Sequence, residues 1–195
     1  MKLRKKFKSC SPSPLRSMQL QKKPPNHFPT MSEFDLELLS DRQDRKGFRC
    51  GRESLERYLR EVAKGHLSKG VSITRVLVER GTQKPKAILG YFTLTSTVAS
   101  AVNWPGTAKG LPSMPVPLVL LGKLAVAESW QNRGIASLLL AAARQIAAAS
   151  MRGSGGIGLA IDPADEDLVA FYAKYGFQKV DDHSLRMFLP IDSLC

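Results

Sequence analysis

The chain has 195 residues, with 29 lysines and arginines against 17 aspartates and glutamates, which gives a formal net charge of +12. This length suits one domain with a sizeable core, and no apolar stretch is long enough to span a bilayer, which argues against a membrane protein. Three scattered cysteines without a C-x-x-C pair argue against a disulfide scaffold or a zinc finger. We therefore expect a cytoplasmic globular protein without a metal site.

Most of the positive charge lies in residues 1–30. This segment has eight basic residues, five prolines and no acidic residue, which leaves 21 basic and 17 acidic residues for the rest of the chain. Such a composition cannot bury enough apolar surface to order itself. We expect residues 1–30 to be a disordered, basic, proline-rich extension and residues 31–195 to be the folded domain. Two interpretations of the extension stay open: a real basic arm, or sequence upstream of a natural start at Met31.

The first half of the domain predicts a strand, a helix and a hairpin. Residues 34–38 alternate apolar and acidic side chains, which is the period of a half-buried strand. Residues 52–66 place their leucines and a valine on one helical face. The β-rich segments 73–79 and 88–98, with a turn at 81–85, predict an antiparallel hairpin.

The second half of the domain alternates strands with helices. Residues 115–126 are largely apolar on both faces, which predicts a central strand. Residues 135–151 carry the i, i+3, i+4, i+7 apolar pattern of a helix. The order of elements predicts a mixed α/β sheet with helices on its faces. The remaining expected elements are a loop at 103–114, a strand at 157–161, a helix at 165–175 that ends at Gly176, and strands at 177–180 and 185–189.

The sequence Q-N-R-G-I-A at 131–136 stands between the expected central strand and the long helix. A helix start presents unpaired backbone N–H groups and a partial positive charge, which together bind anions. Gly134 permits close approach of the backbone to a ligand, and Arg133 adds a cation. The motif predicts a phosphate or pyrophosphate site, although on its own it is equally consistent with a solvated loop.

A second motif, F-Y-A-K-Y-G-F at 171–177, follows about 40 residues later. Phe171 and Phe177 suit packing in the core. In this order and context the two motifs resemble the GNAT superfamily of N-acetyltransferases, whose pattern is Q/R-x-x-G-x-G/A followed by F-Y-x-x-x-G-F. The resemblance covers residues 115–180 and implies the GNAT fold, a central mixed and mostly antiparallel sheet flanked by helices in a single α/β domain.

Further segments narrow the resemblance to one branch. F-R-C-G at 48–51, L-x-x-Y-L at 55–59, and the run from P-V-P to L-G-K-L-A-V at 115–126 resemble the GNAT toxins of type II toxin–antitoxin pairs. Lys123 stands where that branch usually has arginine. The resemblance implies acetyl-CoA as donor and the α-amino group of aminoacyl-tRNA as acceptor, which blocks translation. It also implies an antitoxin partner, contact with DNA only through that antitoxin, and a homodimer.

The resemblance also assigns roles to backbone groups. The 131–136 loop and Ser137 would hold the pyrophosphate, and Leu124 and Val126 would bind the pantetheine arm as a sheet edge binds an added strand. A backbone N–H near Val126 would face the developing oxyanion. The expected coenzyme-binding residues are Leu124, Ala125, Val126, Gln131, Asn132, Arg133, Gly134, Ile135, Ala136 and Ser137.

Tyr172 is the expected general acid. A phenol has a reference pKa of about 10, so it stays protonated at neutral pH and can protonate a leaving thiolate. Tyr175, three residues along the same helix, is the rival. No base stands out, which favours an α-amino acceptor, because its pKa of about 7.7–8.0 leaves a neutral fraction without help.

Three hypotheses of function remain at this point. The first is the tRNA-acetylating toxin. The segment from Arg42 to Lys69 has nine basic residues against four acidic ones, and it is either a surface that contacts tRNA phosphates or a solvated helix face. The second keeps the enzyme but takes a protein, polyamine or small-molecule amine as acceptor; the basic balance argues against polyamines. The third is a catalytically silent GNAT-like binding module, against which Tyr172 and the complete coenzyme loop argue.

Overall fold

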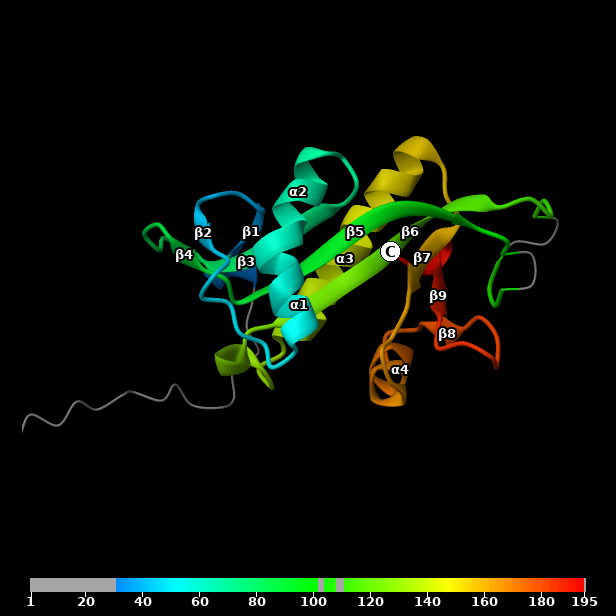
Figure 1. Ribbon diagram of the computed structural model, residues 1–195. Coiled ribbons are helices and arrows are strands. Elements are labelled where there is room, and N and C mark those ends of the chain that lie inside the picture. Colours follow the sequence, from blue (N-terminus) through cyan, green and yellow to red (C-terminus); the bar gives the residue numbers. More distant parts are fainter. Residues whose placement is uncertain (1–30, 102–103, 108–110, 195) are drawn as a thin grey trace, which may run out of the picture.

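A seven-stranded sheet runs through the domain in the order β1-β3-β5-β6-β7-β9-β8 (Figure 1). The computed structural model describes residues 31–101, 104–107 and 111–194. Neighbouring strands are antiparallel except for the parallel pair β6–β7, which confirms the expected mixed, mostly antiparallel sheet. The strands are β1 (Phe34–Leu38), β3 (Ile73–Glu79), β5 (Gly90–Ala99), β6 (Val116–Val126), β7 (Gly158–Ile161), β8 (Gln178–Lys179) and β9 (Met187–Pro190).

One face of the sheet is covered by the helical segment that the sequence predicted at 52–66. It consists of α1 (Glu53–Arg57), a π-helical turn (Tyr58–Val62) and α2 (Ala63–Ser68). Leu59 and Ala63 are fully buried in a cluster with apolar side chains of β3 and β5. The apolar spacing therefore identified the buried face, and the segment lies across the strands that the hairpin pattern predicted.

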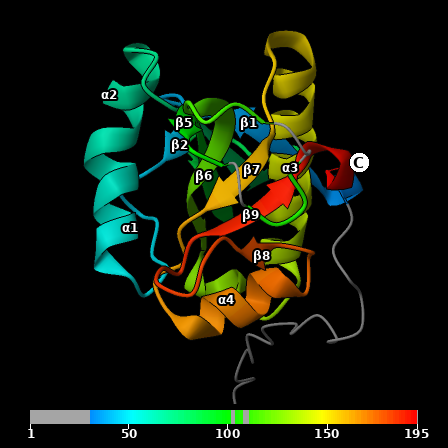
Figure 2. The same cartoon turned by 90° about the vertical axis from the view of Figure 1, so that its right-hand side faces the viewer.

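The opposite face is covered by α3 (Ile135–Ser154), and Figure 2 shows the sheet between the two helical layers (Figure 2). Leucines and alanines of α3 are buried against the strands, as the apolar period predicted. The helix runs three residues beyond the expected end at Met151. It stops at Gly155, whose φ of 81° is left-handed and whose N–H bonds the Met151 carbonyl at 2.8 Å.

The short helix α4 (Glu166–Ala173) follows β7. The Asp165 carboxylate caps it by accepting the Leu168 N–H at 2.9 Å. The last turn, up to the left-handed Gly176 (φ 88°), is no longer α-helical, so α4 is shorter than expected. The β8–β9 hairpin completes the sheet.

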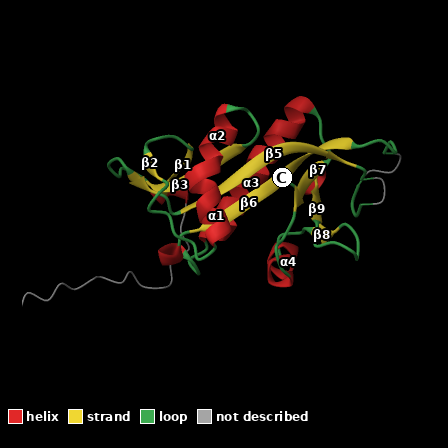
Figure 3. Cartoon of the chain, viewed as in Figure 1, coloured by secondary structure: helices red, strands yellow, loops and turns green. Residues whose placement is uncertain are grey.

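Two short strands were not predicted. β2 (Gln43–Asp44) and β4 (Lys86–Ala87) pair in parallel to form a second, two-stranded sheet (Figure 3). Residues 1–30, for which we expected disorder, and part of the 103–114 loop lie outside the described residues. Within the described part of the chain, no helix is long and apolar enough to cross a membrane.

The strands β6 and β7 diverge, and this divergence creates the space for a site. They pair at only three positions, from Val119 to Leu121 on β6. The β5–β6 ladder is irregular at the same point, because Gly122 is an extra residue between the partners of Thr93 and Leu94, and a bulge of this kind bends and twists a strand. Beyond it β6 continues along β5 alone, while the chain leaves β7 for α4.

The tight contact between β7 and β9 supplies a test of this fold. A Cβ added at Gly158 would lie 2.3 Å from the Leu189 carbonyl oxygen and 2.6 Å from the Phe188 ring. We expect Gly158→Ala to lower the free energy of unfolding by about 1–3 kcal/mol in chemical denaturation, because the overpacked backbone must move. Gly122→Ala is the control, since nothing lies within 4 Å of its added Cβ; equal losses in both variants would contradict the packing.

Candidate active site

A cavity of about 260 Å³ lies between the diverging end of β6 and helix α4. Residues from α1, β6, the start of α3 and α4 line it, so segments far apart in the sequence meet here. Five of the expected coenzyme residues and the expected acid are among them: Leu124, Ala125, Val126, Gln131, Ala136 and Tyr172. The other expected residues lie on the adjoining loop and helix start and do not line this cavity.

The end of β6 offers free backbone groups to the cavity. Ala127 and Leu89 form a hydrogen-bonded pair, because the Ala127 N–H donates to the Leu89 carbonyl at 2.9 Å. Ala125 lies opposite Tyr91, two residues away along each strand. Because hydrogen-bonded pairs alternate in an antiparallel ladder, Ala125 directs its backbone at β5. Leu124 and Val126 then direct their N–H groups away from β5, where no strand pairs with them. This is the geometry expected for an added strand.

The loop before α3 leaves a set of N–H donors open. Asn132 (φ 58°) and Gly134 (φ 80°) both have left-handed backbones, and α3 begins after Gly134 with no side-chain cap and no acidic residue in its first turn. The first N–H groups of a helix have no intrahelical acceptor. The start of α3, from Ile135 to Ser137, therefore has no side-chain cap and no acidic side chain that would compete with an anion.

Two side chains of this loop are engaged within the protein. The Gln131 amide donates to the carbonyls of Cys50 and Val126, each at 3.1 Å. The Arg133 guanidinium lies 5.2 Å from the centre of the Trp130 ring, a cation–π contact. Gln131 thus joins the loop to the end of β6 and to the segment before α1, which is a positioning role.

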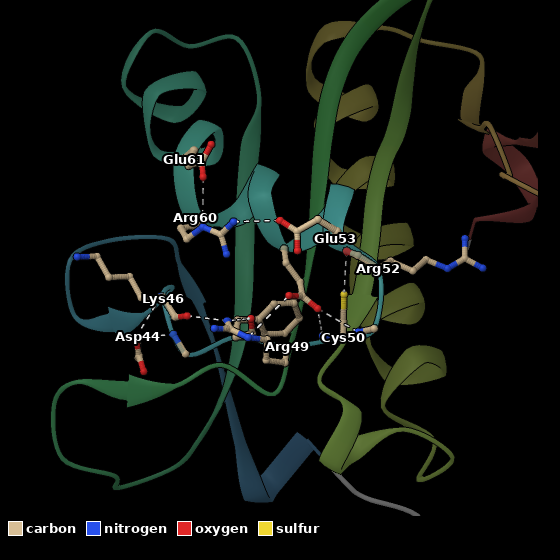
Figure 4. A network of polar contacts seen from close by, with 12 residues as sticks. Asp44, Lys46, Arg49, Cys50, Arg52, Glu53, Arg60 and Glu61 are labelled. Carbon is tan, nitrogen blue, oxygen red and sulfur yellow. Dashed lines mark hydrogen bonds and ion pairs between the residues drawn. The ribbon is translucent and has the colours of Figure 1, made fainter.

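Sequence reasoning missed the residue that holds the segment before α1. The buried Glu56 carboxylate accepts the N–H groups of Cys50 (2.8 Å) and Gly51 (3.0 Å). Figure 4 shows Cys50 in the polar network of this segment, together with Arg49 and Arg52 (Figure 4). Gly51 has φ 78°, which explains the glycine of the F-R-C-G motif. Burial raises the pKa of the Cys50 thiol, so this thiol stays protonated beside the cavity. An acidic residue next to the apolar stripe of a helix was the only signal for Glu56.

Tyr172 and Tyr175 have different surroundings. Tyr172 lines the cavity, is 5% exposed, and its hydroxyl makes no hydrogen bond to any residue that the structure describes. Burial raises the pKa of Tyr172 to about 12, against a smaller lowering by Arg52. The Tyr175 hydroxyl is instead hydrogen-bonded to the Ser137 hydroxyl and lies outside the cavity lining. The geometry favours Tyr172 as the acid and commits the Ser137 side chain to Tyr175.

The acidic residues near α4 have structural partners. Asp165 caps α4, Asp162 accepts two hydrogen bonds from Arg186 at 2.6 and 2.8 Å, and Glu166 lies 3.3 Å from Lys179. Of the cavity-lining residues in the described part of the chain, none is a histidine, aspartate or glutamate. Among the described residues, no three potential ligands gather to hold a metal ion. The described lining therefore contains one phenol, Tyr172, and no carboxylate or imidazole that could act as a base.

Much of the basic segment from Arg42 to Lys69 is neutralised by ion pairs. Its members with an acidic group within 4.0 Å are Arg45, Arg49, Arg52, Arg60 and Lys64. Arg42, Lys46, Arg57 and Lys69 have no acidic partner among the described residues. The cations free to meet phosphate groups are thus fewer than the nine that the sequence contains.

Comparisons with known proteins identify the family and the fold. Residues 83–179 match the acetyltransferase (GNAT) domain family. Over 143 residues the chain is 30% identical to a tRNA-acetylating toxin of Mycobacterium tuberculosis (strain ATCC 25618 / H37Rv), an alignment that covers 72% of this chain and 81% of the relative. The chain belongs to the GNAT acetyltransferase family.

Solved GNAT structures resemble the whole described domain. A tyrosine-to-phenylalanine mutant of KacT is 29% identical with a TM-score of 0.75, over 83% of this chain and 97% of that one. AtaT complexed with acetyl-methionyl-tRNAfMet is 25% identical with a TM-score of 0.74, over 83% and 97%. A tyrosine-to-phenylalanine mutant of AtaT, bound to the C-terminus of the antitoxin AtaR and acetyl-CoA, is 25% identical with a TM-score of 0.69, over 83% and 96%.

Membership of this family makes acetyl-CoA the donor, and the free backbone groups fit it. Acetyl-CoA supplies an acetyl group on a thioester and a pyrophosphate. The uncapped start of α3 suits the pyrophosphate, and the unpaired N–H groups of Leu124 and Val126 suit the pantetheine amides and the thioester oxygen. We propose these groups as the coenzyme site and Tyr172 as the acid.

Removal of one oxygen atom tests the acid. We expect Tyr172→Phe to lower kcat by about 10²–10⁴-fold, the usual contribution of a positioned acid, while the Kd of acetyl-CoA in calorimetry stays within about threefold, because the backbone donors remain. Tyr175→Phe is the matched control: it removes only the contact with Ser137 and is expected to keep most of kcat. If Tyr175→Phe has the larger effect on kcat, the two roles must be exchanged.

Proposed function

We propose that this protein transfers the acetyl group of acetyl-CoA to the α-amino group of aminoacyl-tRNA and thereby blocks translation, as the toxin of a type II toxin–antitoxin pair. The observation that carries the proposal is the cavity itself: it joins free backbone donors to an unbonded phenol and contains no basic catalyst. The similarity to a tRNA-acetylating toxin, and to AtaT in complex with acetyl-methionyl-tRNAfMet, supports this class of substrate.

The reaction follows from the groups around the cavity. The neutral α-amine attacks the thioester carbonyl, and the Val126 N–H stabilises the negative oxygen that forms. The C–S bond then breaks and the Tyr172 hydroxyl protonates the departing thiolate. The amine gives a proton to solvent, and the Tyr172 phenolate takes one back from solvent, so the protons balance over the cycle. Because the pKa of Tyr172 is raised by burial, the phenol is fully protonated at the pH at which the amine reacts.

The absence of an acidic or histidine side chain in the cavity lining selects among acceptors. An α-amino group, with a pKa of about 7.7–8.0, has a useful neutral fraction near neutral pH, whereas a lysine or polyamine nitrogen near 10.4 needs a base to remove its proton. In aminoacyl-tRNA the carboxyl group of the amino acid is an ester, which lowers the pKa of the α-amine further. Aminoacyl-tRNA meets this requirement better than a protein lysine or a polyamine.

The remaining features of the proposal concern partners and place. Relatives have been solved with the C-terminus of the antitoxin AtaR and as a KacTA–DNA complex; for this chain we propose an antitoxin partner, DNA contact through that antitoxin, and a homodimer. Charged tRNA is cytoplasmic, and so is the proposed site of action. The acetyltransferase domain comprises residues 31–195, and residues 1–30 are an extension outside it.

Transfer of a labelled acetyl group tests the substrate class. The protein is incubated with labelled acetyl-CoA and, in parallel, with charged tRNA, deacylated tRNA, protein and polyamine pools. We expect label on charged tRNA only, released by mild base together with the amino acid. Label on deacylated tRNA, or on the protein pool alone, would contradict the proposal, and label on no pool would favour a silent binding module.

Salt dependence tests whether Arg57 at the end of α1 and Lys69 directly after α2, two cations without an acidic partner among the described residues, contact tRNA. Each phosphate contact by a lysine or arginine adds about one unit to the slope of log affinity against log salt concentration. We expect the double variant Arg57→Ala, Lys69→Ala to lower that slope by about two units for aminoacyl-tRNA. Binding of wild-type protein that does not respond to salt would show that this surface is not the contact.

A further inference from the structure

Arg52 is the only cationic side chain among the described residues that line the cavity. It precedes α1, and in Figure 4 its side chain points away from the other labelled groups. Its guanidinium lies 2.9 Å from the Asp165 carboxylate at the start of α4, with side-chain exposures of 49% and 41%. The ion pair therefore connects the two walls of the cavity at its solvent side.

Asp165 does not depend on Arg52 for its position. One carboxylate oxygen caps α4 through the Leu168 N–H, and only the other meets Arg52. The Leu168 N–H is also the main reason that the pKa of Asp165 is low, with Arg52 second. A half-exposed ion pair of this kind adds little to stability, so a stronger anion can displace the carboxylate at small cost.

The position of Arg52 indicates whether an anion that displaces Asp165 belongs to the coenzyme or to the acceptor. The donors proposed for the coenzyme pyrophosphate lie at the start of α3, which covers one face of the sheet, while Arg52 leads into α1, which covers the other. An acceptor that approaches the thioester from the α1 side passes Arg52. Arginine binds phosphate through two parallel hydrogen bonds, which a single carboxylate oxygen does not match.

We propose that Arg52 exchanges Asp165 for the phosphate group next to the aminoacylated terminal nucleoside of the acceptor. This inference rests on the proposed function and adds to it the means of selection: the cavity recognises an amine that carries a nucleotide phosphate nearby. Amino acids, peptides and polyamines lack this group. The ion pair with Asp165 then occupies Arg52 until an acceptor with a phosphate arrives.

Substitutions of the two partners of the ion pair are expected to change KM in opposite directions. Arg52→Ala removes the phosphate ligand, and we expect KM for aminoacyl-tRNA to rise about tenfold, the usual size of a charged hydrogen bond. Asp165→Asn keeps a side chain that caps helices well but removes the competing charge, so KM is expected to fall about two- to fivefold. A merely structural ion pair predicts that both substitutions impair the reaction alike.

A pair of small acceptors isolates the phosphate. One is an adenosine that carries the amino acid preferred on tRNA; the other is the same compound extended by cytidine through a phosphodiester. We expect wild-type protein to prefer the phosphate-bearing compound in kcat/KM by about tenfold, and Arg52→Ala to abolish this preference. Arg80→Ala is the matched control, because Arg80 forms an Arg–Asp pair of the same 2.9 Å length with Asp35 on the far edge of the sheet; its preference should equal that of wild type.

Three results would overturn the inference. The first is a rise in the acetyl-CoA Kd in Arg52→Ala as large as the rise in KM, since the anion would then belong to the coenzyme. The second is an equal effect of Arg52→Ala on both small acceptors. The third is a rise in KM in Asp165→Asn. Wild-type protein that acetylates no aminoacyl-tRNA would instead overturn the proposed function, so the two failures are distinguishable.

Discussion

The site depends on the short pairing between β6 and β7. Three paired positions hold the strands together. Past the bulge at Gly122, β6 continues along β5 alone, while the chain after Ile161 leads through a short loop into α4. If the ladder continued, the N–H groups of Leu124 and Val126 would bond another strand and no donors would remain for a thioester. The same divergence leaves room for α4, which brings Tyr172 to the cavity. One irregularity thus supplies the donors that we propose for the oxyanion and the coenzyme, and the position of the proposed acid.

A chain of hydrogen bonds holds the two walls of this opening in register. Glu56 fixes the backbone of Cys50 and Gly51, and the Gln131 amide then joins the Cys50 carbonyl to the Val126 carbonyl. Because Gln131 engages the carbonyl of Val126 and leaves the Val126 N–H free, the end of β6 presents a donor beside a carbonyl that already has a partner. Glu56 is buried, so loss of its carboxylate would leave the buried Cys50 N–H and the more exposed Gly51 N–H without their acceptor. The helix on the acceptor side and the coenzyme loop are in this way parts of one network.

Local patterns predicted the elements and the coenzyme loop, but not the contacts between them. The apolar period of α3, the alternation of β1 and the glycine of the 131–136 loop are properties of neighbouring residues, and the structure has each where the sequence indicated. β2 and β4 are two residues long, too short for any period to be visible.

Contacts between residues far apart in the sequence could not be predicted. The hydrogen bond between Ser137 and Tyr175 spans 38 residues and the ion pair of Arg52 with Asp165 spans 113, so both depend on the tertiary fold. The choice of Tyr172 over Tyr175 needed those contacts, since the helical spacing of the two tyrosines left them equivalent.

Net charge is a weaker guide to the substrate than the position of single charges. Most of the +12 belongs to residues 1–30, and within the folded part the basic segment from Arg42 to Lys69 loses five of its nine cations to neighbouring carboxylates. A paired cation still attracts an anion if its partner is held by something else. Asp165 is held by the N–H of Leu168, whereas Glu56 is buried and needs its donors. Arg52 is therefore the cation of this segment that can exchange its carboxylate partner for a phosphate beside the reacting groups. Under this proposal, one such arginine is enough to select an amine that carries a nucleotide, without a large basic surface.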